Sequence, residues 1–241
     1  RLMGDFEPIE ETYIFLINKT LEQKELAYKP YPFQLANTFD KNIKETILIN
    51  QFQFESKWDG IRSQIIKRSN NISIWTRGEE LVNKTFPELV NIIADLKNDF
   101  VVDGEILIWN ENKNCPKDFS FLQKRLGRKS PSQKIQKDLP VAFIAYDILE
   151  INGNDIRSKI LSERRNILEE KFMNSTSEDK TNISKKIKIT KLLQLNSWEE
   201  VEEAKDSARN INTEGLVIKN KNSKYLPGRK KGNWWKYKID P

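Results

Sequence analysis

Histidine is absent from the 241 residues of this chain, and cysteine occurs only once, as Cys115. The lack of histidine excludes Ser-His-Asp and Cys-His nucleophile systems, histidine-ligated zinc and acid/base catalysis by an imidazole. A lone cysteine can form neither an internal disulfide nor a thiolate cluster for zinc or iron–sulfur, and it favours a reducing, cytoplasmic location. An enzyme of this composition works with lysine, arginine, carboxylates and a hard, oxygen-bound metal such as Mg²⁺.

Long hydrophobic runs are also missing. No apolar stretch approaches the roughly 20 residues that a membrane-spanning helix needs, and no signal-peptide pattern opens the chain. With 37% hydrophobic and 32% charged residues, the composition is typical of a globular protein, which we expect to be a monomer without a membrane partner. The net charge of +6 is compatible with a polyanionic partner, but many lysine-rich proteins carry such an excess without binding nucleic acid.

Short runs of β-branched and aromatic residues predict strands, and apolar residues at helical spacing predict helices. The predicted strands cover residues 52–57, 61–68, 72–76, 101–109, 141–149, 187–193, 216–219 and 234–239. The predicted helices cover residues 86–97, 119–126, 158–173 and 198–210. The interleaving of strands, hairpins and helices predicts an α+β fold of mostly antiparallel sheets flanked by helices, with the apolar strand 141–149 buried on both faces.

The N-terminal part of the chain differs from the rest. Residues 1–28 carry apolar side chains loosely at helical spacing, which predicts one or two helices. Pro30 and Pro32 then punctuate the chain, and we interpret residues 29–33 as a linker into a main domain that covers residues 29–241.

Six segments contain polar residues inside or at the ends of predicted strands, where charged side chains need partners. They are Glu55-Ser56-Lys57-Trp58-Asp59-Gly60-Ile61-Arg62, Arg77-Gly78, Asp103-Gly104-Glu105, Tyr146-Asp147, Glu214-Gly215-Leu216-Val217-Ile218-Lys219 and Trp234-Trp235-Lys236-Tyr237-Lys238. Each alone has an ordinary explanation, such as a solvated turn, an ion pair, a core hydroxyl or the solvent face of a strand. Their order along one chain points instead to a shared site.

In this order the segments resemble the covalent nucleotidyltransferase superfamily of polynucleotide ligases and mRNA-capping enzymes, and most closely the ATP-dependent DNA ligases of bacteria and archaea. Residues 86–89, 122–128 and 225–229 match this pattern as well. The resemblance runs from about residue 29 to the C-terminus and implies the ATP-grasp-like adenylation fold. Residues 1–28 resemble the C-terminal remnant of the helical DNA-binding domain that precedes it in the family.

The resemblance implies a mechanism that starts at Lys57. This lysine would attack the α-phosphate of ATP and hold AMP as a phosphoramidate, and AMP would then pass to the 5′-phosphate of nicked double-stranded DNA for sealing. Such chemistry serves DNA repair, replication and recombination. Because a lysine amine is mostly protonated at neutral pH, we expect partial burial and neighbouring cations, among them Lys219, Lys236 and Lys238, to favour its neutral form.

The resemblance also assigns the other site residues. Glu55 would sit beside the adenine, and Tyr146 would stack on it. Arg62, Arg77 and Glu105 would contact the phosphate and ribose of the nucleotide. The residues expected to contact phosphate are Lys219, Lys230, Lys236 and Lys238. The residues expected to bind Mg²⁺ are Glu105 and Glu214. Lys230 occupies a position where relatives usually have arginine, so it lacks the planar fork of a guanidinium.

Alternatives remain open at this point. Relatives carry a following OB-fold domain that is absent from this chain, so we expect a fragment that binds ATP or carries AMP but seals nicks poorly. The lysine motif is shared with RNA ligases and GTP-using capping enzymes. A non-catalytic nucleic-acid-binding platform would also account for the basic residues interleaved with Trp234, Trp235 and Tyr237.

Overall fold

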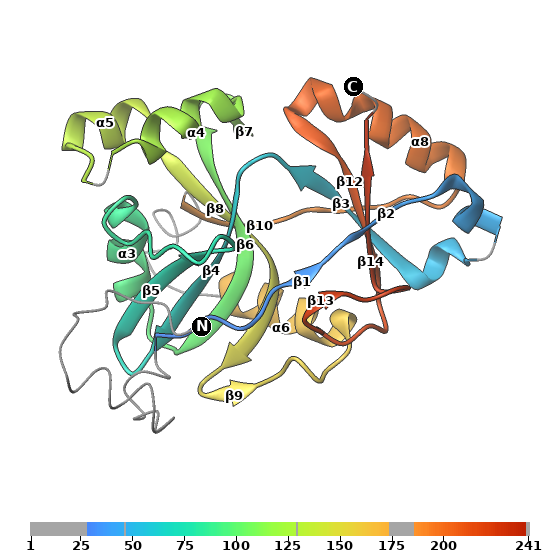
Figure 1. The fold of residues 1–241 in the computed structure, drawn as a ribbon, viewed down its shortest axis with the longest axis horizontal. Helices are drawn as coiled ribbons and strands as arrows, with labels where there is room; N and C mark the ends of the chain where they lie inside the picture. Colours follow the sequence, from blue (N-terminus) through green and yellow to red (C-terminus); the bar gives the residue numbers. More distant parts are fainter. Residues whose placement is uncertain (1–27, 46, 129, 174–185, 240–241) are drawn as a thin grey trace.

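The computed structural model describes residues 28–45, 47–128, 130–173 and 186–239, and it places two β-sheets side by side (Figure 1). The larger sheet has the strand order β10-β8-β6-β4-β5, with β7 paired to β6 and β9 paired to β8. Its strands are β4 (Ile61–Arg68), β5 (Asn71–Thr76), β6 (Phe100–Asn110), β7 (Cys115–Pro116), β8 (Val141–Ile151), β9 (Asn154–Asp155) and β10 (Ile187–Ile189). All neighbours are antiparallel except the parallel pair β10 and β8.

The smaller sheet has the order β11-β3-β12-β14-β2 and is antiparallel except for the parallel pair β14 and β2. Its strands are β2 (Asn37–Thr38), β3 (Phe52–Trp58), β11 (Leu192–Leu193), β12 (Thr213–Asn220) and β14 (Trp234–Lys238). A separate parallel pair joins β1 (Gln34–Leu35) to β13 (Gly228–Arg229). The expected α+β class with mostly antiparallel sheets is therefore confirmed.

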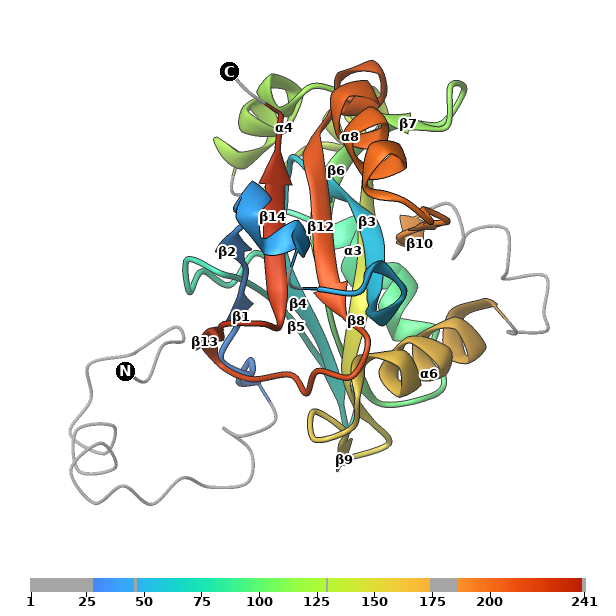
Figure 2. The same ribbon diagram turned by 90° about the vertical axis from the view of Figure 1, so that its right-hand side faces the viewer.

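Helices cover one face of each sheet. The helical elements are the 3₁₀ turns η1 (Lys41–Glu45), η2 (Ile49–Gln51) and η3 (Ser207–Ile211) and the helices α3 (Pro87–Ala94), α4 (Phe119–Leu126), α5 (Gln133–Asp138), α6 (Leu161–Met173) and α8 (Trp198–Asp206). Leu89 of α3, Leu122 of α4 and Leu168 of α6 belong to the core of the larger sheet. Val201 of α8 belongs to a second core on the smaller sheet. Figure 2 shows α8 lying against β12 and β3.

Alternation along the strands leaves the other face of the smaller sheet free for polar residues. Side chains of a strand point to opposite faces in turn, and Phe54, Leu216, Ile218, Trp235 and Tyr237 pack into the core beneath α8. Their neighbours on β3, β12 and β14 point to the opposite face, toward the larger sheet. This pattern explains why charged residues alternate with large apolar ones in these three strands.

Residues 187–193, predicted as one strand, form two strands in different sheets. Ile187–Ile189 pairs with β8 of the larger sheet, and Leu192–Leu193 pairs with β3 of the smaller sheet. The crossing point is fixed by Thr190, which is buried and accepts hydrogen bonds from Trp58 at 3.0 Å and from Arg165 at 2.7 Å. The prediction of one continuous strand is wrong because a run of apolar residues does not reveal a change of sheet.

Helix boundaries differ from the predictions in four places. The predicted helix 86–97 ends at Ala94, where the buried Lys67 donates to the carbonyl oxygens of Ile93 and Ala94 at 3.1 and 3.0 Å. The predicted helix 158–173 begins only at Leu161. The predicted helix 198–210 divides into α8 and the 3₁₀ turn η3, and α5 was not predicted. The predicted N-terminal helices lie outside the described residues, which begin at Tyr28, and the domain boundary after residue 28 stays a prediction.

No helix in the described part of the chain is both long enough and apolar enough to cross a membrane.

Asp147, the polar interruption of the apolar strand β8, pairs with Arg164 of α6. The Arg164 Nε and Nη2 atoms donate to the two carboxylate oxygens at 2.8 and 2.9 Å, and both side chains are fully buried. Two buried, oppositely charged groups in this bidentate geometry compensate each other, whereas either one alone would be a buried, unpaired charge. The pair therefore fastens α6 to the larger sheet.

Replacing Asp147 with alanine should lower the free energy of unfolding by about 3–5 kcal/mol, because it leaves Arg164 buried without a counter-charge. Chemical denaturation measures this change. The matched control is Asp155→Ala, which breaks the more exposed ion pair with Arg157 and should cost less than about 1 kcal/mol. Equal losses in the two variants would contradict the assignment.

Glu202 of α8 binds side chains from η1, from β14 and from its own helix. Burial alone would raise the pKa of its carboxyl group, but hydrogen bonds from Lys44, Tyr237 and Lys205 outweigh burial and lower the pKa to about 2. A carboxylate whose pKa is lower in the folded state stabilises the fold above its ordinary pKa near 4.5. This stabilisation is lost as the pH falls from there toward 2.

The difference in melting temperature between the wild type and Glu202→Gln should therefore be largest near neutral pH and should shrink below about pH 4.5. Thermal unfolding of both proteins from pH 7 to pH 3 measures this difference. Comparing the two proteins cancels the titration of the other carboxylates. A difference that stays constant across this range would contradict the proposed hydrogen bonds.

Candidate active site

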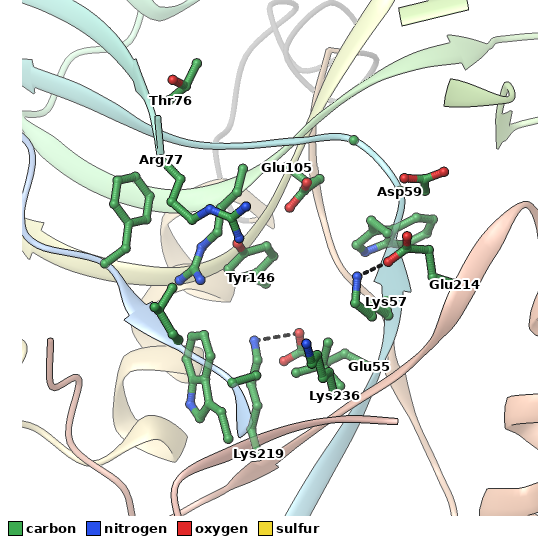
Figure 3. A pocket seen from close by; sticks show the side chains of 18 of the residues that line it. Glu55, Lys57, Asp59, Thr76, Arg77, Glu105, Tyr146, Glu214, Lys219 and Lys236 are labelled. Atoms are coloured by element: carbon green, nitrogen blue, oxygen red, sulfur yellow. Dashed lines mark hydrogen bonds and ion pairs between the residues drawn. The ribbon is translucent and has the colours of Figure 1, made fainter. Parts of the chain in front are cut away.

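A cleft of about 880 Å³ lies between the two sheets (Figure 3). Every predicted site residue except Lys230 lines this cleft. These residues are Glu55, Lys57, Arg62, Arg77, Glu105, Tyr146, Glu214, Lys219, Lys236 and Lys238. The smaller sheet supplies one wall from β3, β12 and β14, and the larger sheet supplies the other from β4, β6 and β8.

The turn between β3 and β4 carries the chain from one wall to the other. A Cβ atom at Gly60 would lie 2.3 Å from the carbonyl oxygen of Ile106, so no residue with a side chain fits there without a shift of the backbone. Because the turn is this tight, Lys57 at the end of β3 faces the cleft close to Arg62 at the start of β4.

Lys57 lies opposite a β-bulge. Thr213 and Leu216 of β12 pair with Trp58 and Ser56, so two residues of β12, Glu214 and Gly215, oppose the single Lys57. Gly215 has a φ of 127°, which favours glycine. Bulges re-aim side chains, and here the bulge directs the Glu214 carboxylate onto the Lys57 amine, with which it forms an ion pair.

Glu214 also contacts Lys238, whose Nζ lies 3.2 Å from its carboxylate. Burial acts to raise the pKa of Glu214, but the hydrogen bonds and charges of Lys57 and Lys238 lower it. The sequence led us to expect cations around Lys57, and Lys236 and Lys238 do line the same cleft. The structure adds a carboxylate, that of Glu214, as the direct partner of the amine.

Glu105 faces the cleft from β6, where it is paired in register with Arg62. Burial raises the pKa of its carboxyl group to about 8, against the opposing charges of Arg62 and Lys57. Among the described residues no group of three or more carboxylate or thiol ligands gathers for a metal ion. Mg²⁺ usually takes only one or two carboxylates and completes its shell with water and substrate phosphates, so Glu105 and Glu214 fit a magnesium site that the nucleotide helps to form.

Glu55, two residues before Lys57 on β3, forms a buried ion pair with Lys219 of β12. Lys219 Nζ lies 2.7 Å from Glu55 Oε2, and Gln53 donates to the other oxygen of Glu55 at 2.8 Å. Burial lowers the pKa of Lys219, and the charge of Glu55 opposes this shift. Lys219 thus lies on Glu55 rather than beside Lys57, which differs from the expectation that it adds to the cationic field around the nucleophile.

Tyr146 lies at a second bulge. Asp103 and Gly104 of β6 pair with Asp147 and Ala145 of β8, which leaves Tyr146 as the extra residue between them. Its ring is almost perpendicular to the indole of Trp234, with centroids 6.3 Å apart, and Lys219 Nζ lies 4.4 Å from the centroid of each ring. The bulge explains how an aromatic side chain of a strand buried on both faces reaches the cleft.

Arg62 is held tightly at the cleft wall. Its Nη2 and Nε atoms donate to the fully buried Asp103 at 2.7 and 3.2 Å. The aromatic rings of Phe33, Tyr146 and Trp234 lie within 6 Å of the guanidinium carbon, at 5.2, 5.8 and 5.6 Å. A guanidinium fixed in this manner presents its remaining N–H groups in a defined direction.

None of the remaining predicted cations is fully buried. Arg77 is exposed, and its backbone N–H donates to the carbonyl oxygen of Arg62 at 2.8 Å. Lys236 is partly buried. Lys230 does not line the cleft, whereas its neighbour Arg229 does. Consecutive residues of an extended chain point to opposite sides, so the basic side chain that reaches the cleft here is one position earlier than predicted.

Sequence reasoning missed one wall altogether. Residues 28–36, which we call the entry segment, were interpreted mainly as a linker, yet most of them line the cleft. The Gln64 side chain binds both the N–H and the carbonyl oxygen of Tyr31 at 2.8 Å, and Gly228 donates to the carbonyl oxygen of Phe33 at 2.9 Å. The prolines could have signalled an extended chain, but nothing local revealed the surface on which it lies.

Comparisons with known proteins agree with this geometry. The family model of the ATP dependent DNA ligase domain matches residues 33–238. A probable DNA ligase of Koribacter versatilis is 27% identical over 99% of this chain and 43% of its own length. The DNA ligase of Methanocaldococcus jannaschii is 29% identical over 98% of this chain and 41% of its own length. The chain thus spans less than half the length of these relatives.

Solved structures show the same fold. A mycobacterial DNA ligase D complexed with ATP and MES has 25% identity and a TM-score of 0.63, and the match covers 86% of this chain and 60% of that one. A Chlorella virus DNA ligase-adenylate, at 17% identity, has a TM-score of 0.61 over 87% of this chain and 69% of its own. Both sheets and every predicted site residue that lines the cleft fall within the residues that the family model matches, and the chain therefore belongs to the ATP-dependent DNA ligase family and contains its adenylation domain.

Proposed function

We propose that this domain catalyses the first chemical step of DNA ligation, in which the Lys57 amine attacks the α-phosphorus of ATP. A bond forms between Nζ and the α-phosphorus, the bond to the bridging oxygen of pyrophosphate breaks, and the ammonium group of Lys57 gives up two protons to solvent and keeps one on the nitrogen. The product is lysyl-AMP. The observation that supports this most directly is the position of Lys57, at a strand end in the same cleft as Glu105 and Glu214 (Figure 3).

The residues that line the cleft suit the two parts of a nucleotide. Lys57, Lys236 and Lys238 would provide positive charge where negative charge grows on the phosphates during attack. Glu55 and Tyr146 would offer a hydrogen-bond acceptor and an aromatic ring to the adenine. Because Lys219 contacts both of these residues, we propose that it orders the adenine site instead of holding phosphate.

Glu214 has two possible partners, the Lys57 amine and a magnesium ion. In the structure its carboxylate pairs with the amine. Mg²⁺ bound by Glu214 and Glu105 would neutralise phosphate charge. Glu214 would then serve either the Lys57 amine or the metal ion, and an amine without this partner would be free to attack.

After the first step, we propose that AMP passes from Lys57 to the 5′-phosphate of a nick in double-stranded DNA, and that the 3′-hydroxyl then displaces it. This assignment rests on family membership, because RNA ligases and capping enzymes share the lysine chemistry. A non-catalytic binding platform would have no use for a lysine with two facing carboxylates. The domain would serve DNA repair, replication or recombination within a longer ligase.

The wild-type protein incubated with ATP and Mg²⁺ should gain the mass of one adenylate, and Lys57→Ala should gain none, because it removes the proposed nucleophile. Intact-mass spectrometry measures the adduct. The control is Lys134→Ala, which removes an exposed lysine of α5 that does not line the cleft and should be labelled like the wild type. An adduct on Lys57→Ala would contradict the assignment of Lys57 as the nucleophile.

Among radiolabelled ATP, GTP and NAD, only ATP should label the protein covalently. Mixing the labelled protein with a duplex that has a 5′-phosphorylated nick should move the label to the DNA, since the phosphoramidate is a reactive donor. Gel electrophoresis follows both transfers. Labelling by GTP would favour a capping-type enzyme, and transfer to nicked RNA but not DNA would favour an RNA ligase.

A further inference from the structure

Tyr225 belongs to the segment 225–229, which the sequence comparison singled out and which the proposed chemistry leaves without a role. Its side chain is buried, with 2% of its surface exposed. It follows β12 on the loop that leads to β13, and its ring lies nearly perpendicular to the indole of Trp234, with centroids 6.0 Å apart. Tyr225 does not line the cleft itself.

The hydroxyl group of Tyr225 donates to Asp103 Oδ2 at 2.6 Å, the same oxygen that accepts from Arg62 Nη2 at 2.7 Å. Asp103 is fully buried and therefore depends on these protein donors. Burial and the adjacent Asp103 charge raise the pKa of Tyr225 well above its ordinary value, so the phenol keeps its proton and remains a donor.

The same hydroxyl also joins the entry segment to this network. It accepts from the backbone N–H of Gln34 at 3.1 Å, and the Gln34 side chain accepts from the backbone N–H of Leu226 at 2.7 Å. Gln34 lies on β1, directly after Phe33, whose ring faces the Arg62 guanidinium. One phenol therefore connects three segments that meet behind the cleft wall: β6, the loop before β13 and the entry segment.

We propose that Tyr225 is a positioning residue for nucleotide binding, which acts through Asp103 to orient Arg62 toward the phosphate and ribose of ATP. Without the phenol, the Asp103 carboxylate loses one of its two fixed donors and can rotate, and the guanidinium bound to it rotates as well. This inference rests on the proposed adenylation of Lys57.

The test compares Tyr225→Phe with the wild type in single-turnover labelling over a range of ATP concentrations. Phenylalanine keeps the ring packing and removes only the hydroxyl. The half-saturating ATP concentration should rise roughly tenfold, in line with the loss of one charged hydrogen bond, and the saturating rate should change less. Tyr237→Phe is the matched control, because Tyr237 also donates to a carboxylate, Glu202, but away from the cleft.

A second comparison separates positioning from general destabilisation. In an Arg62→Ala background, Tyr225→Phe should raise the half-saturating ATP concentration no further, because the group that it orients is gone. Partial unfolding would also raise the half-saturating ATP concentration, but it would do so in the Arg62→Ala background as well, so the comparison distinguishes it from positioning of Arg62.

The inference would be overturned if Tyr225→Phe had the same half-saturating ATP concentration as the wild type. It would also be overturned if the control Tyr237→Phe raised this concentration as much as Tyr225→Phe does. Either result would leave the proposed function intact. An undiminished effect in the Arg62→Ala background would also overturn the inference. A wild-type domain that takes no label would overturn the proposed function and this inference with it.

Discussion

The close approach of the β3–β4 turn to β6 is the constraint on which the site depends. Gly60 lies so near the carbonyl oxygen of Ile106 that the backbone can cross between the sheets within two residues. The crossing brings the end of one sheet against the other, and it sets Lys57 and Arg62 on facing walls. A looser turn would leave the same side chains on separate surfaces, where neither could act on a molecule held by the other.

Much of the site could be predicted because its residues follow strand periodicity. Lys236 and Lys238 lie two residues apart on one strand, and alternation alone assigns them to the same face. The motif around Lys57 carried the family resemblance, and the structure gathers its expected partners in one cleft. The apolar strand 141–149 was expected to be buried on both faces, and β8 is buried from Val141 to Glu150.

What the sequence could not reveal depends on contacts between distant segments. The bulges that turn Glu214 and Tyr146 toward the cleft break strand periodicity, and only the register of the partner strands exposes them. The pairing of Lys219 with Glu55 spans 164 positions. Arg229, next to the predicted Lys230, shows the same limit on a smaller scale, since a one-residue error in register reverses which side chain faces the cleft.

The ion pair between Lys57 and Glu214 also limits which molecules can reach the amine. While Nζ is bonded to the carboxylate, an incoming electrophile has to displace Glu214 before it can bond to the nitrogen. A ligand that fills the cleft contacts many of its residues, and these contacts offset the loss of the ion pair, whereas a small reactive aldehyde gains no such contacts. The carboxylate thus acts as a size filter in front of the nitrogen.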